Sequence, residues 1–425
     1  MSYLSAYIFI CGAVGRVSVN VIGELYITEL MLGVAGVILV ARSGKMLFRG
    51  SAGWLFLFGT LWLLSQVFTD FYRTTPFEDW TRGWAKIIFF LIDFGGLILL
   101  TKLRMDRILI FFAGFACSYL LQSLFFPDYG QAGGEFVDGM WKFGLSAFFD
   151  LGAAVLSASP MLPRLLGASG EFIPLATMGI VNLVLNSRGA FGVAMAAVAF
   201  GMLKRFFDLW PGFRAKLTPL TFAILIGGGV VFSQAMLAIY ETAAANDWLG
   251  QAAKGKYEAQ TAGQLNLFQA GRTESLASTQ AIADSPIIGH GSWAKDVYYV
   301  AIMVDRLEAA GIKVEGDPYG EGLIPTHSHV LGSWVEAGMM GGLFWIVVFI
   351  LTIVALYRSL KVKEVPGTFA AFVLISLLWS IPFSPFANTF RINDAATLCV
   401  ILSIYRSYQC SSVRNRSRKL APIGA

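Results

Sequence analysis

Long apolar runs recur along the whole chain, and they limit what it can fold into. A helix needs about 20 apolar residues to cross a hydrocarbon core of roughly 30 Å. The charged fraction is 14% and the hydrophobic fraction 56%, whereas about a quarter of the residues of a soluble domain are charged. A β-barrel would show short alternating segments instead. The sequence therefore predicts an all-α polytopic membrane protein, with residues 1–425 forming a single integral membrane domain.

About twelve segments qualify as transmembrane helices when apolar runs are weighed against turn and charge signals. The predicted ranges are 3–15, 22–41, 52–70, 84–100, 108–126, 143–159, 169–186, 190–203, 217–240, 337–357, 368–384 and 393–408.

The basic residues predict how these helices are oriented, because cytoplasmic loops of membrane proteins are enriched in Lys and Arg. With the N-terminus inside, the predicted cytoplasmic loops and the C-terminal tail hold eighteen basic residues, and the short outer loops hold six. The sequence thus predicts both termini in the cytoplasm and the long loop 241–330 outside.

The loop 241–330 is too long to be a bare connection. One helix is expected after Gly271 and up to Asp284, where Pro286 and the following glycines end it. A second is expected from about Val297 to Ala310. Its apolar residues recur at helical spacing, and they are Val297, Val300, Ala301, Val304 and Leu307. We expect a loop that carries amphipathic helices and forms a small external cap.

Two of the three histidines, His327 and His329, lie where this loop meets an apolar helix. An imidazole can accept a proton near neutral pH, so His327 is a candidate general base. The structural interpretation is a polar residue at a membrane interface. Residues two apart do not share a helix face, so His329 is not expected to act as a matched partner. No HExxH or HxxEH spacing is present, and neither a metal nor a cofactor is predicted.

Three arginines in the predicted outer segments have two interpretations each. Arg188 stands between two apolar segments, Arg272 follows Gly271 at a helix start, and Arg391 begins the last apolar run. Each side chain either extends to the outer headgroups or binds a phosphate, because a guanidinium offers a planar fork of donors. Glu336, close to an apolar boundary, should have a partner such as an arginine or a helix N-terminus.

Four motifs in order resemble one superfamily. His327-Ser328-x-x-Leu331-x4-Glu336-x-Gly338-x-x-Gly341 resembles the hallmark segment of the O-antigen ligase and O-antigen polymerase superfamily. Upstream, Ser187-Arg188-Gly189, Gly271-Arg272 and the turn Pro286–Gly291 are similar to its other motifs. The register to Leu331, Glu336 and Gly338 fits from His327 rather than from His329.

The resemblance implies a metal-independent, inverting glycosyltransferase with a type C membrane fold. Such enzymes work in the bacterial inner membrane with the active site facing the periplasm. His327 would be the base, and Arg188 and Arg272 would bind the donor diphosphate. Glu336, His329 and Arg391 would be supporting residues.

The implied partners are an undecaprenyl-diphosphate-linked glycan as donor, the lipid A–core or a growing glycan as acceptor, and the lipid bilayer, with no nucleic acid. An O-antigen ligase is the leading hypothesis, and an O-antigen or exopolysaccharide repeat-unit polymerase is the alternative. A transporter of lipid-linked sugars is less favoured, because it would place charges at mid-membrane in both halves of the chain.

Overall fold

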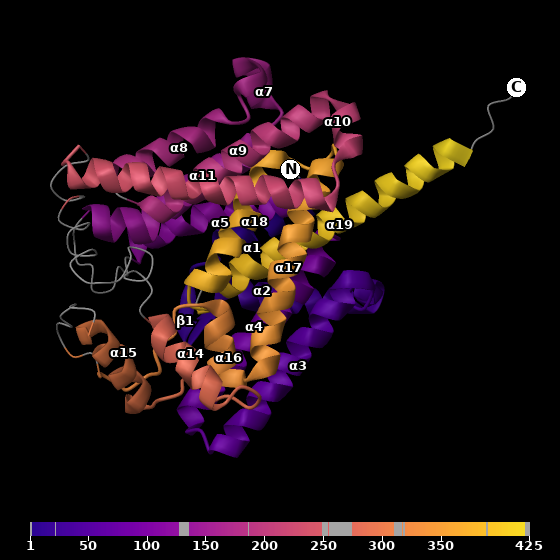
Figure 1. Cartoon of the computed structure of the whole chain (residues 1–425). Helices are drawn as coiled ribbons and strands as arrows, with labels where there is room; N and C mark the ends of the chain where they lie inside the picture. The colour runs from indigo at the N-terminus through magenta and orange to yellow at the C-terminus, as the bar shows by residue number, and fades with distance from the viewer. Residues whose placement is uncertain are drawn as a thin grey trace, which may run out of the picture.

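A computed structural model describes residues 2–21, 23–126, 136–185, 187–248, 254, 274–309, 317, 319–387 and 390–420. The described chain is almost entirely helical (Figure 1). In its first half the elements are α1 Tyr3–Ala13, β1 Ser18–Asn20, β2 Glu24–Tyr26, α2 Ile27–Ser43, η1 Gly44–Met46, α3 Gly50–Arg73, α4 Phe77–Thr101, α5 Met105–Phe125, the π-helix η3 Phe136–Leu145, α6 Ser146–Ser157, α7 Met161–Leu166, η4 Gly167–Ser169, α8 Ile173–Val184 and α9 Arg188–Leu209. In its second half they are α10 Pro211–Lys216, α11 Pro219–Ala245, α14 Glu274–Asp284, α15 Val297–Ala309, α16 His329–Ala337, α17 Met339–Lys361, α18 Gly367–Phe383 and α19 Phe390–Leu420.

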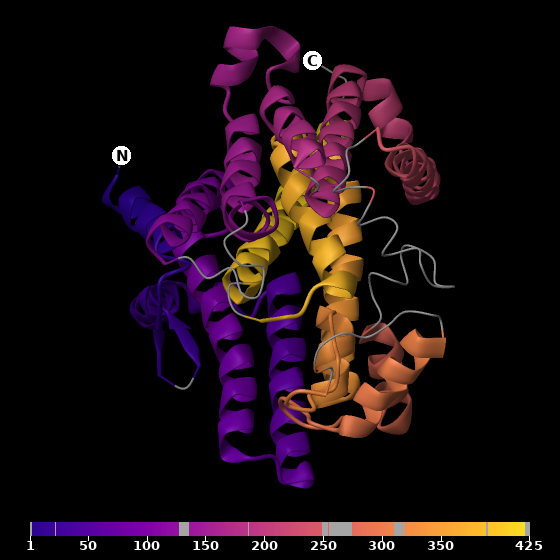
Figure 2. The same cartoon turned by 90° about the vertical axis from the view of Figure 1, so that its left-hand side faces the viewer.

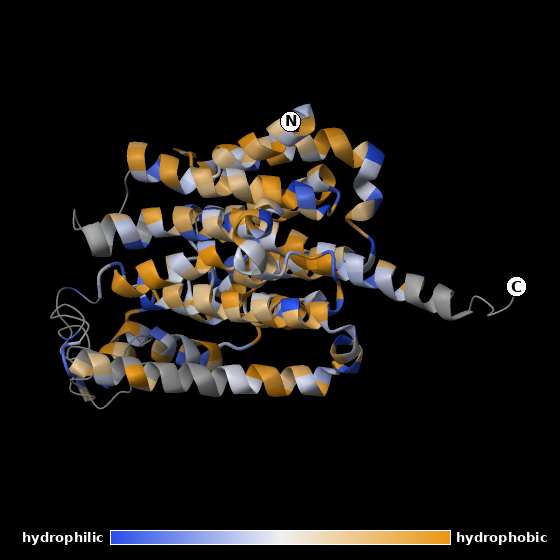
Figure 3. Ribbon diagram, turned by 90° about the horizontal axis from the view of Figure 1, so that it is seen from above, coloured by the Kyte–Doolittle hydropathy of each residue, from blue (hydrophilic) through white to orange (hydrophobic). Residues whose placement is uncertain are grey.

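Six of the described helices are long and apolar enough to cross a membrane, namely α2 with η1, α3, α4, α5, α9 and α17. The outer face of the bundle is apolar, as Figure 3 shows by hydropathy. On α2, for example, Val37 is 77% exposed and Ile38 is 67% exposed. An apolar face of this extent suits lipid rather than water. The chain is therefore an all-α, multi-pass membrane protein.

Small residues allow the closest helix contacts. Gly12 of α1 and Gly114 of α5 lie where a Cβ atom would be 2.2 Å and 2.1 Å from the carbonyl oxygens of the facing helix. Gly96 of α4 packs in the same way on α2, because an added Cβ atom would lie 2.7 Å from the carbonyl oxygen of Leu32. In lipid, helices associate through such close packing rather than through the hydrophobic effect.

The helices alternate in direction, so that their ends gather at two ends of the bundle. α9 and α18 run antiparallel, since Gly189 faces Trp379 and Gly201 faces Thr368. At one end, Arg406 donates to the carbonyl of Lys102 at 2.9 Å. At that same end the guanidinium of Arg358 lies 3.9 Å from the ring centroid of Tyr405.

We call this the basic end, because the loops around Lys102, Arg358 and Lys204 meet there. The other end, which carries α14, α15, α16 and the start of α9, is called the pocket end. α14 to α16 lie beside the ends of α3 and α4 and away from α7 and α10 (Figures 1 and 2).

Two predicted details are wrong. The range 22–41 does not begin as a helix, because Glu24–Tyr26 pairs with Ser18–Asn20 in a short antiparallel hairpin. On α15, Val297 is 55% exposed, and Tyr299 at 4% takes the buried place together with Val300 and Val304. The two helices α14 and α15 themselves lie where the sequence predicts them.

Candidate functional site

The segment that carries His327 is fixed by Ser328 at the N-terminus of α16. The Ser328 hydroxyl accepts a hydrogen bond from the backbone N–H of Leu331 at 3.1 Å, which caps the helix. It also donates to the carbonyl of Ile381 at the end of α18, at 2.9 Å. Ser328 is buried, whereas His327 is exposed. The imidazole of His327 therefore stands on an anchored backbone and is accessible from outside.

His329 lies in the core instead. Its side chain is fully buried, with Nδ1 2.6 Å from the carbonyl oxygen of Ser384 and Nε2 3.0 Å from a carboxylate oxygen of Asp394. A carbonyl oxygen only accepts, so Nδ1 donates to Ser384, while Nε2 faces the carboxylate of Asp394. The ring also packs edge-on against Trp345, with 4.7 Å between centroids. Both ring nitrogens of His329 are therefore engaged within the core.

Two of the motifs meet at the other end of α16. The helix stops at Gly338, whose φ of 66° and ψ of −156° belong to a region that only glycine adopts readily. The turn before α15 covers this stop: His290 N–H donates to the carbonyl of Val335 at 2.7 Å, and Gly291 N–H to that of Glu336 at 3.0 Å. These bonds satisfy carbonyls that a helix end leaves free.

Asp70 of α3, which the sequence did not single out, anchors the same turn. Its carboxylate accepts from both the backbone N–H and the hydroxyl of Ser292, each at 2.7 Å. It also accepts from the indole of Trp84 at 2.7 Å. Arg73 adds a bond to the carbonyl of Gly289 at 3.0 Å. The external turn is therefore tied to α3 and α4 rather than lying loosely over them.

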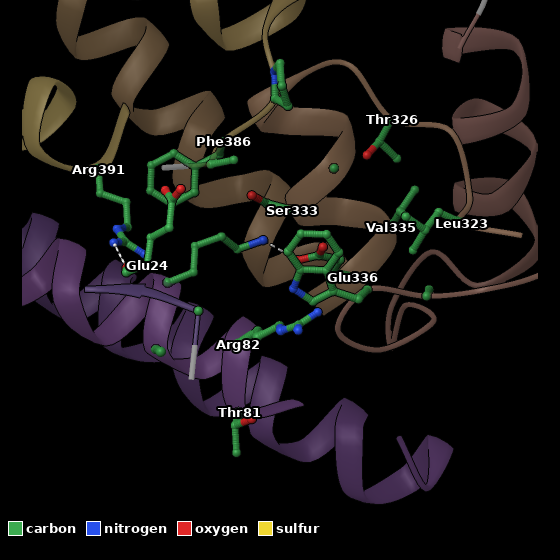
Figure 4. A pocket seen from close by; sticks show the side chains of 18 of the residues that line it. Glu24, Thr81, Arg82, Leu323, Thr326, Ser333, Val335, Glu336, Phe386 and Arg391 are labelled. Atoms are coloured by element: carbon green, nitrogen blue, oxygen red, sulfur yellow. Dashed lines mark hydrogen bonds and ion pairs between the residues drawn. The ribbon is translucent and has the colours of Figure 1, made fainter. Parts of the chain in front are cut away.

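A cavity of about 790 Å³ opens at the pocket end, and we call it the outer pocket (Figure 4). Both neighbours of His327, Thr326 and Ser328, line it, together with Glu336 and Arg391. The rest of its wall comes from the hairpin, α4, α14, residues 293–294 before α15, the loop before α16, α16 itself, the loop after α18 and α19. The lining residues used below are Glu24, Arg82, Lys86, Phe89, Glu274, Trp293 and Phe386.

Charged side chains in the outer pocket are largely paired. Lys86 Nζ lies 2.6 Å from a carboxylate oxygen of Glu336, with the two side chains 13% and 18% exposed. Glu336 therefore has a partner, as expected, but the partner is a lysine rather than an arginine or a helix N-terminus. Lys86 was missed, although Arg82 and Lys86 are four residues apart on α4 and so share a helix face.

Arg391 is almost buried, with its side chain 8% exposed. It lies 2.7 Å from a carboxylate oxygen of Glu29 and donates to the carbonyl of Glu24 at 2.9 Å. The side chain of Glu24 accepts from the hydroxyl of Tyr26. Burial, and then this hydrogen bond, raise the pKa of Tyr26 above its ordinary value, so the hydroxyl keeps its proton.

The remaining candidates lie apart from the outer pocket or outside the described residues. Arg188 is the first residue of α9 and is partly buried. It lies at the pocket end but does not line the outer pocket. Arg272 falls in the range 255–273, which lies outside the described residues. Within the described ranges, no group of three or more His, Cys, Asp or Glu side chains could hold a metal ion.

The comparisons with known proteins give no match. No model of a protein family, no curated protein and no solved structure matches the chain.

Proposed function

We propose that this chain is a glycosyltransferase of the bacterial inner membrane that works on the periplasmic face. It moves a glycan from undecaprenyl diphosphate onto a sugar hydroxyl, as an O-antigen ligase with the lipid A–core as acceptor. In this proposal about twelve helices cross the membrane in a type C fold, both termini are cytoplasmic, and residues 241–330 form a periplasmic cap.

One observation carries the proposal. The outer pocket brings together both neighbours of His327, Glu336 and Arg391, at the end of the bundle where Arg188 begins α9. Ser328 and Glu336 belong to the motif that contains His327, Arg188 belongs to a second motif, and Arg391 is a separate candidate. A scaffold protein would have no need to gather them around one cavity of this size.

The chemistry needs few groups. The exposed imidazole of His327 takes the proton from the acceptor hydroxyl as its oxygen attacks the anomeric carbon of the donor. The bond from that carbon to the diphosphate oxygen breaks, and the configuration inverts. Arg188 and Arg272 neutralise the charge that develops on the leaving diphosphate. A paired carboxylate for hydrolysis is not required.

A deletion strain tests this function and also identifies the acceptor. For a ligase we expect lipopolysaccharide without polymer, and polymer stranded on undecaprenyl diphosphate. Products limited to a single repeat would show a polymerase, in which the growing glycan is the acceptor. Unchanged lipid-linked intermediates and an unchanged surface glycan would refute the proposal. Complementation with Arg188→Ala should fail, whereas Arg104→Ala, whose exposed side chain pairs with Asp106 at the basic end, should restore the wild-type products.

A further inference from the structure

Trp293 is an indole held out of its preferred backbone conformation in the wall of the outer pocket. Its φ is 51°, in the left-handed region that a bulky side chain rarely adopts. The residue before it, Ser292, is fixed on Asp70 by two hydrogen bonds of 2.7 Å. The residue after it, Ala294, accepts from Ile324 N–H at 2.9 Å. Strain of this kind persists only where the surroundings impose it, and it gathers at functional sites.

The indole of Trp293 lines the pocket and is partly exposed to solvent. Trp293 is 37% exposed, and the guanidinium of Arg82 lies 6.0 Å from its ring centroid. This cation–π contact, made by an exposed arginine, restrains the ring without covering it. Phe89 and Phe386 add two further aromatic rings to the same cavity.

The polar lining of the outer pocket is balanced in charge. It contains three basic residues, Arg82, Lys86 and Arg391, and three acidic ones, Glu24, Glu274 and Glu336. A diphosphate would meet as many carboxylates as cations there. A sugar fits better, because each hydroxyl both donates and accepts and can bridge a pair such as Lys86 and Glu336. The C–H face of the sugar ring suits the negative face of an indole.

Arg188, the described candidate for the donor diphosphate, does not line this cavity; nor does His327 itself, but both of its neighbours do. The base must lie within hydrogen-bond reach of the acceptor hydroxyl. A sugar in the outer pocket would lie next to the segment that carries the base. It would therefore occupy the position of the acceptor.

We infer that the outer pocket is the acceptor subsite. Trp293 is the platform on which an uncharged sugar ring of the acceptor stacks, and the Lys86–Glu336 pair binds its hydroxyls. This inference rests on the proposed function for the reaction, but the binding of the sugar can be measured without it.

The test variant is Trp293→Gly, because glycine adopts a positive φ without strain and the indole is lost at no cost to the backbone. Trp293→Asn, which also tolerates this region, is the second variant. Trp210→Phe is the matched control, since Trp210 is 57% exposed and follows α9 at the basic end. The probe is the core oligosaccharide released by mild acid from the lipopolysaccharide of the host, titrated by calorimetry into the purified full-length protein.

Wild type and Trp210→Phe should bind the oligosaccharide with equal Kd, and both Trp293 variants should bind about tenfold more weakly or worse. In the transfer assay the variants should raise the acceptor KM by a similar factor and leave the donor KM unchanged. Equal binding by wild type and Trp293→Gly would overturn the subsite, as would a change in the donor KM alone. If wild type binds the oligosaccharide but transfers nothing to it, the proposed reaction fails while the sugar site stands.

Discussion

At the scale of single residues, Asp70 anchors the turn at residues 285–296. It accepts four hydrogen bonds, two from Ser292 and one each from Trp84 and Gln66, and is 3% exposed. Asp70→Ala leaves these donors unsatisfied, and each buried orphan costs about 1–3 kcal/mol. We expect a clear fall in the thermal midpoint in detergent, and faster proteolysis in the turn at residues 285–296.

Asp106 provides the control for this prediction. Its carboxylate pairs with Arg104 at 2.9 Å, but the side chains are 60% and 57% exposed. Exposed pairs contribute about 0–1 kcal/mol, so Asp106→Ala should hardly move the midpoint. Equal midpoints for the Asp70 and Asp106 variants would show that Asp70 does not anchor the turn.

The ion pair of Lys86 and Glu336 gives a second prediction at this scale. Lys86→Met leaves a mostly buried carboxylate without its cation, which should cost about 1–3 kcal/mol. Adding Glu336→Gln removes the charge that needs a partner, so the double variant should recover most of the lost stability. Thermal unfolding of the two variants measures this, and a double variant no more stable than Lys86→Met would refute the pairing.

Local signals in the sequence identify some site residues but not those whose partners are distant in the chain. Glu336 is recognisable as a charge near an apolar boundary that requires a partner. Nothing near Asp70 shows that it binds Ser292, 222 residues away. In the same way, the motif register distinguishes His327 from His329, but nothing near His329 shows that it contacts Asp394, 65 residues on.

At the scale of elements, the break between α16 and α17 determines where the external turn docks. At Gly338 an added Cβ atom would lie 2.0 Å from the carbonyl oxygen of Ile287. Gly338→Ala combines this clash with a backbone region that costs a side chain about 1–3 kcal/mol. We expect the turn to detach, and glycan transfer and thermal stability to fall together.

Gly152 of α6 is the matched glycine, because nothing lies within 4 Å of an added Cβ there. Gly152→Ala should be neutral or stabilising by up to about 1 kcal/mol, since alanine favours the helix. If Gly338→Ala keeps wild-type transfer and stability, the turn does not depend on this break.

Helical periodicity and length predicted where the helices lie more accurately than where each helix begins and ends. A helix lies over each of the twelve predicted apolar ranges, and α14 and α15 lie within the long loop where helices were expected. The hairpin at Ser18–Tyr26 was missed because its strands are three residues each, too short for an alternating pattern to show. The separate helix α16 was missed because the predicted range 337–357 begins only where α16 ends.

At the scale of the whole molecule, the two ends of the bundle should lie on opposite sides of the membrane. The loops with most basic residues gather at the basic end. The positive-inside rule predicts that such loops share one side of the membrane. Single cysteines at Arg164 and at Glu321, in a background with the four native cysteines replaced, test this in intact cells. A membrane-impermeant maleimide should label only the cysteine at 321; labelling of the one at 164 instead would invert the orientation.

Rates of transfer by the purified protein, wild type against His327→Ala, test the central claim most directly. With a lipid-linked glycan donor and a lipid A–core acceptor, the loss of the base should lower the rate about 10²–10⁴-fold. Glu321→Ala, an exposed change six residues earlier, should transfer at the wild-type rate. Transfer by His327→Ala at the wild-type rate would contradict the account.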